Sequence, residues 1–301
     1  MNRLDPISLR LFVRIAETGT LTAAADSEHI SAAAVSKRLT ELESLLQVRL
    51  LSRSNKGVVP TPAGLALVGL ARSALHELDQ VRTQMQSFSR GVRGVVRVCA
   101  SLSAITQFLA QPLRQFSQRY PDIELQLDEK TSPGVVQAVA DNAADIGIYL
   151  PVTHGPSLHA LPYREDQLAV VVPKGHALAR RKRVCMQDLV EHHLIGIQSG
   201  SAIQIELGRA AASRGLPLRQ RFQVSSFDPL CAMVSQGLGI GVLPYRCALD
   251  HAKSKPLHVL TLSDPAAKRQ FMIGVRHWES LPPAARLLHQ QLLSDVTLTP
   301  G

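Results

Sequence analysis

The sequence predicts an α/β protein with an N-terminal winged helix-turn-helix, a long linker helix and a C-terminal two-lobed domain. Three observations predict it. Short capped amphipathic segments fill residues 1–61, a continuous helical pattern fills 62–91, and strand-like runs alternate with helical runs over 92–301. We take these ranges as domains, with lobe I formed by about 92–165 and 266–301 and lobe II by about 166–265.

Start and stop signals define the first two helices. Asp5-Pro6 supplies a capping side chain and a proline where no amide hydrogen is needed, and Gly19 ends the helix. Thr20 can cap a second, alanine-rich helix that runs to about Glu28, and His29-Ile30 forms a short turn. A third helix then follows after a tight turn, which is the pattern of a helix-turn-helix.

The third helix covers residues 31–46, SAAAVSKRLTELESLL. At about 3.6 residues per turn, Val35, Leu39, Leu42 and Leu46 form an inward apolar stripe, and a small, polar strip faces outward. In a helix-turn-helix such a strip enters the major groove of DNA, although an ordinary surface helix shows the same stripe. The residues expected to contact DNA from this helix are Ser31, Ala33, Ser36, Lys37, Arg38 and Thr40.

Residues 52–61, SRSNKGVVPT, predict a β-hairpin wing, with a solvated loop as the alternative. Arg53 and Lys56 would meet phosphates or a minor groove from this wing. Thr61-Pro62 repeats the cap-plus-proline signal and begins a helix that reaches about Phe88, near 40 Å at about 1.5 Å per residue. Its apolar seam, which favours pairing with a second copy, comprises Leu67, Val68, Leu70, Leu75, Leu78, Val81, Met85 and Phe88.

From Val95 onward, strands alternate with helices. The expected strands are 95–100, 123–129, 145–150, 168–173, 193–197, 221–225, 240–244 and 271–275, and the expected helices include 104–120, 135–142 and 284–293. A strand near Phe271 and the helix at 284–293 follow a middle block of about 166–262. This order indicates two lobes, with the chain passing from the first to the second and back. Ligands in such arrangements bind between the lobes, at the carboxyl ends of strands.

The composition favours a soluble protein with a polyanionic partner. Hydrophobic residues make up 45% and charged residues 19%, the net charge is +9, and no apolar run approaches the roughly 18 residues of a membrane helix. The start, MNRLDPISLRLF, is unlike a signal peptide because Asp5 and Arg10 interrupt it. We therefore expect a cytoplasmic protein with no membrane partner.

Catalytic, metal and cofactor chemistry is not indicated. There is no nucleophile paired with a base, no metal-ligand set among eleven histidines and no phosphate loop. Gly237, Gly239 and Gly241 imitate a dinucleotide fingerprint, but they lead from a helix into a strand, so close packing explains them better. Four cysteines lack CxxC spacing; Cys185, beside a basic run, and Cys231 leave a redox role open.

The segment LRLFVRIAETGTLTAAADSEHISAAAVSKRLTELESLLQVRLLSRSNKGVVPTPAG resembles the DNA-binding region of LysR-type transcriptional regulators. The resemblance continues through FSQRYPDIELQL, AADIGIYLP, DQLAVVVPKGHALA and VSQGLGIGVLP. It implies a winged helix-turn-helix, a dimerising linker helix, an effector domain like periplasmic binding proteins, and assembly as dimers or tetramers. Two departures are Ala32-Ala33, where the family commonly has Gln-Pro, and Leu51, where it commonly has Phe.

Carried over by position, the resemblance implies an effector cleft at the carboxyl ends of the strands. Hydroxyls and helix-start amides suit a carboxylate, although each hydroxyl could instead be a helix cap. The implied residues are Ser101, Leu102, Ser103, Thr131, Ser132, Tyr149, Gln198, Ser199, Gly200, Ser201, Ser226 and Phe227.

These observations predict a sequence-specific regulator that binds a double-stranded DNA operator, with a small, anionic organic effector and RNA polymerase as further partners. Two alternatives remain: a thiol-based redox-responsive regulator, and a small-molecule binding protein without regulation.

Overall fold

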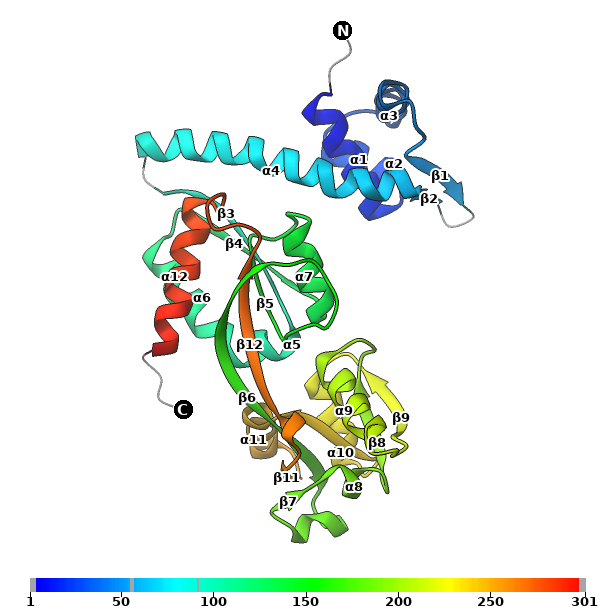
Figure 1. Ribbon diagram of the computed structural model, residues 1–301, viewed down its shortest axis with the longest axis vertical. Coiled ribbons are helices and arrows are strands. Elements are labelled where there is room, and N and C mark those ends of the chain that lie inside the picture. The colour runs from blue at the N-terminus through cyan, green and yellow to red at the C-terminus, as the bar shows by residue number, and fades with distance from the viewer. Residues whose placement is uncertain (1–3, 55–56, 91, 298–301) are drawn as a thin grey trace. The chain divides into compact units, whose positions relative to one another are not determined.

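The computed structural model describes residues 4–54, 57–90 and 92–297 (Figure 1). It divides into two compact units, one formed by residues up to 93 with 141–143 and the other by the rest of the chain. Within the described ranges, no helix is both long and apolar enough to cross a membrane.

The first unit is a winged helix-turn-helix followed by a long helix. Its elements are α1 (Pro6–Thr18), α2 (Leu21–Ser27), α3 (Ala32–Leu46), the antiparallel strands β1 (Leu51–Ser54) and β2 (Gly57–Pro60), and α4 (Pro62–Arg90). The three predicted caps are confirmed, because the side chains of Asp5, Thr20 and Ser31 accept backbone amide hydrogens of the helices that follow them. Gly19 ends α1 at φ 71°, a left-handed conformation that glycine adopts freely.

Three contacts connect the wing to the helices. A carboxylate oxygen of Glu43 in α3 accepts the backbone amides of Leu50 and Leu51 at 2.7 and 3.2 Å. The amide of Val58 in β2 donates to the carbonyl of Gly19 at 2.9 Å. The Thr61 hydroxyl donates to the Arg49 carbonyl at 2.7 Å and caps α4 by accepting the Gly64 amide. The wing is therefore tied at its beginning, middle and end.

The apolar seam of α4 divides into two parts. Leu67, Val68 and Leu75 pack against the helix-turn-helix core. The remaining side chains of the seam that the structure describes, Leu70, Leu78, Val81 and Met85, are between 51% and 68% exposed. The single seam predicted from the sequence thus covers the unit's own core at one end and presents an uncovered strip at the other.

The second unit has two lobes with separate hydrophobic cores. Lobe I contains β3 (Gly94–Ala100), α5 (Leu102–Ala104), a π-helical turn (Ile105–Leu109), α6 (Ala110–Arg119), β4 (Ile123–Glu129), α7 (Ser132–Ala140), β5 (Ile146–Tyr149) and α12 (Pro283–Thr297). Lobe II contains β7 (Arg183–Val184), α8 (Met186–Leu189), β8 (His193–Ile197), α9 (Ala202–Ala212), β9 (Arg219–Val224), α10 (Phe227–Ser235), β10 (Ile240–Pro244), α11 (Tyr245–Ser254) and β11 (Leu257–Leu262).

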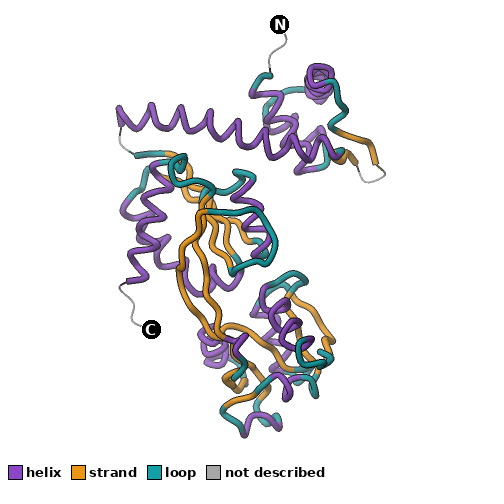
Figure 2. The backbone as a smooth tube through the Cα atoms, viewed as in Figure 1, coloured by secondary structure: helices purple, strands orange, loops and turns teal. Residues whose placement is uncertain are grey.

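Two long strands connect the lobes, β6 (His159–Pro173) and β12 (Lys268–Val275). Figure 2 shows them side by side, and β6 pairs with β12 over its first half and with β10 and β11 over its second half. The sequence predicted only residues 168–173 of β6 as strand. The first half was missed because residues 159–167, HALPYREDQ, show no regular alternation of apolar and polar side chains and include a proline, and they form a strand by pairing with β12.

The helix predicted over 104–120 is also more complex than expected. It begins earlier, with α5, and continues through the π-helical turn before α6. A π-helical turn holds one more residue than an α-helical turn and occurs frequently at functional sites. Here it begins two residues after Ser103, the last of the predicted cleft residues Ser101–Ser103.

We expect Gly64→Ala to destabilise the first unit by about 1–3 kcal/mol, because its Cβ would lie 2.1 Å from the Leu50 carbonyl oxygen. Gly208→Ala in α9 is the matched control, since a Cβ there meets open space. This substitution should increase the free energy of unfolding by up to about 1 kcal/mol. Urea unfolding followed by circular dichroism measures both. Similar changes in both variants would contradict the close approach of α4 to Leu50.

Candidate functional site

The outward face of α3 is the first candidate site. Of the predicted contact residues, Ser31, Ala33, Ser36, Lys37 and Thr40 are exposed. The inward stripe is confirmed, with Val35 and Leu42 buried and Leu39 and Leu46 packed against the core. Within the described part of the chain, Lys37 forms no ion pair. The face is therefore small, polar and positively charged, as a phosphate contact requires.

Arg38 and the wing residues are placed differently. The Arg38 guanidinium lies 3.5 Å from both carboxylate oxygens of Asp5, which also caps α1, so it connects α3 to α1 and is half-buried. Sequence spacing alone did not indicate this pairing. Arg53 lies in β1, opposite Val58, and Lys56 lies outside the described residues.

The second candidate site is a cleft in the second unit, with a volume of about 380 Å³ when the open space at its mouth is included. It brings together eight predicted effector residues: Ser101, Leu102, Ser103, Thr131, Ser132, Gln198, Ser201 and Phe227. They come from the carboxyl ends of β3, β4 and β8 and from the beginnings of α5, α7, α9 and α10. Helix N-termini present unpaired amide hydrogens, so this edge of the sheet favours an anion.

The remaining lining residues were missed by sequence reasoning. They are Lys130, Leu150, Ile197, Ala202 and Ile203. Lys130 is the important omission, because it supplies a positive charge beside the hydroxyls of Thr131 and Ser132. Its position directly after a predicted strand and before two predicted site residues was the signal that could have identified it.

Four predicted effector residues do not line this cleft. Tyr149 is buried, and its ring lies within 3.0 Å of the position that a Cβ of Gly274 would occupy, while the next residue, Leu150, lines the cleft. Burial raises the pKa of Tyr149. The Ser199 hydroxyl accepts a hydrogen bond from Gln223 at 3.1 Å, Gly200 turns the chain at φ 80°, and Ser226 precedes α10. These three lie in loops that border the cleft, and a Cβ at Gly200 would lie 3.8 Å from Thr131.

The hydroxyl groups at the cleft differ in what they already bind. Ser132 accepts the Leu150 amide at 3.1 Å, and Ser201 accepts the Gln204 amide at 3.3 Å as the cap of α9. The Ser101 side-chain oxygen is buried and has no hydrogen-bond partner among the described residues. A buried hydroxyl without a partner costs free energy, so Ser101 is the group that a ligand would satisfy.

A buried ion pair lies where the two connecting strands leave lobe I. Arg269 of β12 and Asp166 of β6 face each other in register, and their side chains are 2% and 4% exposed. Arg269 Nε donates to Asp166 Oδ1 at 2.7 Å, and Gln107 of the π-helical turn donates to Asp166 Oδ2 at 2.7 Å. The Gln107 amide also lies 3.1 Å from the Ser103 carbonyl. Hydrogen bonds therefore connect the cleft with both strands.

Three of the four cysteine thiols are buried, and their burial favours the protonated form. Burial raises the pKa of Cys99 to about 11 and the pKa of Cys231 and Cys247 to about 12. The Cys185 thiol donates to an Asp188 carboxylate oxygen at 3.2 Å, although its neighbours in sequence are basic. Among the described residues, no group of three or more side chains could hold a metal ion.

Comparison with known proteins gives two family matches. Residues 7–65 match the bacterial regulatory helix-turn-helix protein, lysR family, and residues 89–297 match the LysR substrate binding domain. The chain is 26% identical over 287 residues to the uncharacterized HTH-type transcriptional regulator YbhD of Escherichia coli, covering 95% of this chain and 90% of that one. It is 28% identical over 258 residues to the HTH-type transcriptional regulator CysL of Bacillus subtilis, covering 85% and 86%.

Solved structures show the same fold. A full-length OxyR variant from Pseudomonas aeruginosa superposes with a TM-score of 0.75 at 22% identity, covering 99% of this chain and 96% of that chain.

We expect Asp166→Asn to reduce the free energy of unfolding of the second unit by about 3–5 kcal/mol, because Arg269 would remain buried without its counter-charge. Asp250→Asn is the control, since that exposed carboxylate pairs with an exposed Lys253 and should change little. Chemical denaturation of the full chain measures both. Equal stability of the two variants would show that the buried pair does not hold the strands together.

Proposed function

Because the chain belongs to the LysR family of transcriptional regulators, we propose that it binds a DNA operator through α3 and the wing and responds to a small carboxylate in the cleft. We propose 1–61 as the DNA-binding domain, 62–91 as the linker helix and 92–301 as the effector domain, with the lobe boundaries predicted above. Its role is binding rather than catalysis.

The DNA-binding proposal rests on the exposed strip of α3. Ser36 and Lys37 carry the polar groups that can reach bases or phosphates, while Ala32 and Ala33 leave room for close approach of the backbone. Because these two alanines offer no base-specific donor, DNA shape and the wing must carry more of the specificity. Arg38 holds α3 in place through its contact with Asp5. We therefore expect it to contribute less to direct DNA contact than Ser36 and Lys37 do.

The exposed strip of α4 supports assembly with a second copy. Leu70, Leu78, Val81 and Met85 recur at intervals of eight, three and four residues, which keeps them on one face of a helix. A second α4 presents the same apolar side chains in a self-complementary arrangement. A dimer, or a tetramer built from dimers, would place two copies of α3 on one operator.

The single observation that carries the effector proposal is the buried Ser101 hydroxyl without a partner, in a cleft that Lys130 also lines. A carboxylate could accept from Ser101 and from the amides at the start of α7 or α9, with Lys130 supplying the opposite charge. We expect a carboxylate to bind better than a neutral ligand, because Lys130 attracts a negative charge. Among the described lining residues there is no acidic side chain to repel it.

The redox alternative is less well supported by the thiols. Cys231 and Cys247 are buried, which raises the pKa of both thiols, and the Cys185 thiol donates a hydrogen bond to Asp188. A sensing cysteine needs an exposed thiolate. A change in DNA binding of the wild type under peroxide that is absent in Cys185→Ser or in Cys231→Ser would favour the redox alternative.

We expect Lys37→Gln to weaken DNA binding uniformly across sequences and to make the slope of log affinity against log salt less negative by about 0.9, the value for one phosphate contact. Fluorescence anisotropy of a duplex selected by the full chain from random DNA, between about 50 and 200 mM KCl, measures it. Lys253→Gln on α11 is the matched control. If selection yields no duplex preferred over bulk DNA, the regulator proposal is wrong.

We expect Ser101→Ala to weaken carboxylate binding about tenfold, the effect of losing one hydrogen bond to a charged group. Lys130→Gln should weaken the binding of carboxylates but leave the binding of the corresponding primary amides unchanged. Thermal shift with a panel of small carboxylates and their amides finds the ligand, and isothermal titration calorimetry measures the affinity.

Ser117→Ala, on the exposed face of α6, and Lys174→Gln, outside the cleft lining, are the matched controls for these variants. Amides that bind as tightly as their carboxylates would contradict an anionic effector while leaving the cleft itself in place. Loss of binding in the controls would place the ligand elsewhere.

A further inference from the structure

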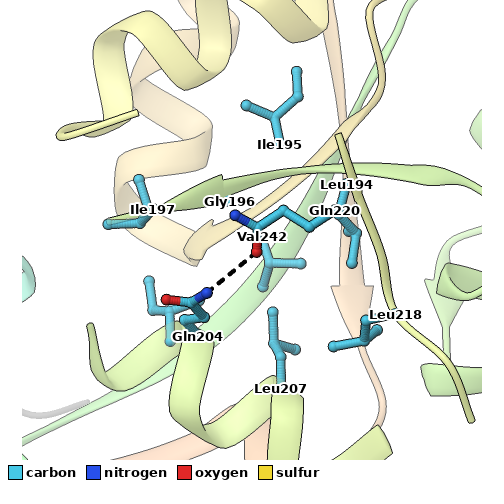
Figure 3. Close-up of a pocket in the computed structure, with 10 residues that line it drawn as sticks. Leu194, Ile195, Gly196, Ile197, Gln204, Leu207, Leu218, Gln220 and Val242 are labelled. Atoms are coloured by element: carbon cyan, nitrogen blue, oxygen red, sulfur yellow. Dashed lines mark hydrogen bonds between the residues drawn. The ribbon is translucent and has the colours of Figure 1, made fainter. Parts of the chain in front are cut away.

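A second pocket lies entirely within lobe II, between α9 and strands β8, β9 and β10 (Figure 3). Its volume is about 390 Å³, including the mouth. Seven aliphatic side chains form its walls, from Leu194, Ile195, Ile197, Ile203, Leu207, Leu218 and Val242. The remaining lining residues, Gly196, Gln204 and Gln220, are uncharged. The pocket is therefore apolar, and it contains amide groups at one side.

The two glutamines form a bridge with one unsatisfied atom. Gln204 Nε2 donates to Gln220 Oε1 at 3.2 Å. The other atom of that amide, Gln204 Oε1, is buried and accepts no hydrogen bond from any described residue. Figure 3 shows this oxygen turned away from Gln220, on the side of Ile197. A buried carbonyl oxygen without a donor costs free energy, which a ligand with one N–H or O–H group would recover.

Gly196 allows the bridge to form. A Cβ at this position would lie 2.7–2.9 Å from the amide atoms of Gln220, closer than any real Cβ contact. With glycine there, the Gln220 side chain can lie across β8 and reach Gln204. The sequence of β8 thus keeps the amide bridge at the edge of the apolar pocket.

We propose that this pocket is a second ligand site, for a small apolar molecule that carries one hydrogen-bond donor, such as a phenol. Aliphatic walls favour an uncharged ring over water, and the open mouth of the pocket provides room for one. The absence of any charged group from the described lining excludes the carboxylates proposed for the cleft. Gln204 Oε1 would accept the ligand's hydroxyl, while the aliphatic walls surround its ring.

Two residues connect this pocket with the cleft. Ile197 and Ile203 line both, and Ser201, which caps α9, lies in the cleft lining as well. A ligand that fixes these side chains in lobe II would change the affinity of the cleft for its own ligand, and the coupling would be reciprocal. The pocket does not depend on the function proposed above, because its binding can be measured without DNA.

The experiment compares 4-fluorophenol with 4-fluorotoluene, which replaces the hydroxyl by a methyl group, on the full chain by ¹⁹F NMR. We expect 4-fluorophenol to bind about fivefold more tightly, the effect of one neutral hydrogen bond. Leu218→Trp, at the half-buried mouth, should fill the pocket and abolish the binding of both. Leu249→Trp is the matched control, because it adds the same side chain to the exposed part of α11 and should bind like the wild type.

Two further variants test the acceptor. Gln204→Leu should remove the preference for 4-fluorophenol and leave 4-fluorotoluene bound. Gln220→Ala removes the bridge but keeps the Gln204 carbonyl, so the preference should persist. Circular dichroism verifies that each variant is folded. The proposal is overturned if the wild type binds neither probe at millimolar concentration, if Leu249→Trp loses binding as Leu218→Trp does, or if Gln204→Leu keeps the preference.

Discussion

Strand β6 belongs to both lobes of the second unit, and the geometry of the cleft depends on that sharing. Its first half pairs with β12 and its second half with β10 and β11, so the lobes have separate cores and are connected by a shared backbone. The buried Asp166–Arg269 pair lies between the two halves. A buried pair adds little net stability compared with an apolar pair, but breaking it is costly, and this fixes the register of β6 against β12. Gln107 extends this constraint to the segment that carries Ser101 and Ser103.

The first unit is organised by short-range bonds of a different kind. Side-chain caps define where α1, α2 and α3 begin, and Glu43 uses one carboxylate oxygen to hold the two residues at which the wing starts. Arg38 then orients α3 through Asp5, the same residue that caps α1. Because the reading face is held from behind, its outward residues are available for DNA. The rigidity comes from buried or half-buried partners, while Ser36 and Lys37 stay exposed.

The parts of the molecule that were predicted from the sequence are those set by local chemistry. The caps at Asp5, Thr20 and Ser31, the stripe through Val35 and Leu42, and strand β4 follow from neighbouring residues and periodicity. Features that depend on distant partners were missed. The first half of β6 lacks the apolar–polar alternation of a strand and pairs with the distant β12, and the role of Arg38 follows from a residue 33 positions away. At the cleft, Leu150 is among the lining residues, whereas the neighbouring Tyr149 packs on β12, and the sequence alone did not distinguish these two adjacent positions.

The π-helical turn at Ile105–Leu109 sets how the side chains within it point relative to the cleft segment before it. Each residue of an α-helix turns the chain by about 100°, whereas a π-helical turn takes up one extra residue in a wider turn, so side chains inside it point in directions that a regular helix would not give them. Ser101 lies before this turn and Gln107 lies within it, so their relative orientation depends on its extra residue. Chain length in this helix is therefore as strict a determinant of the cleft as any side chain that lines it.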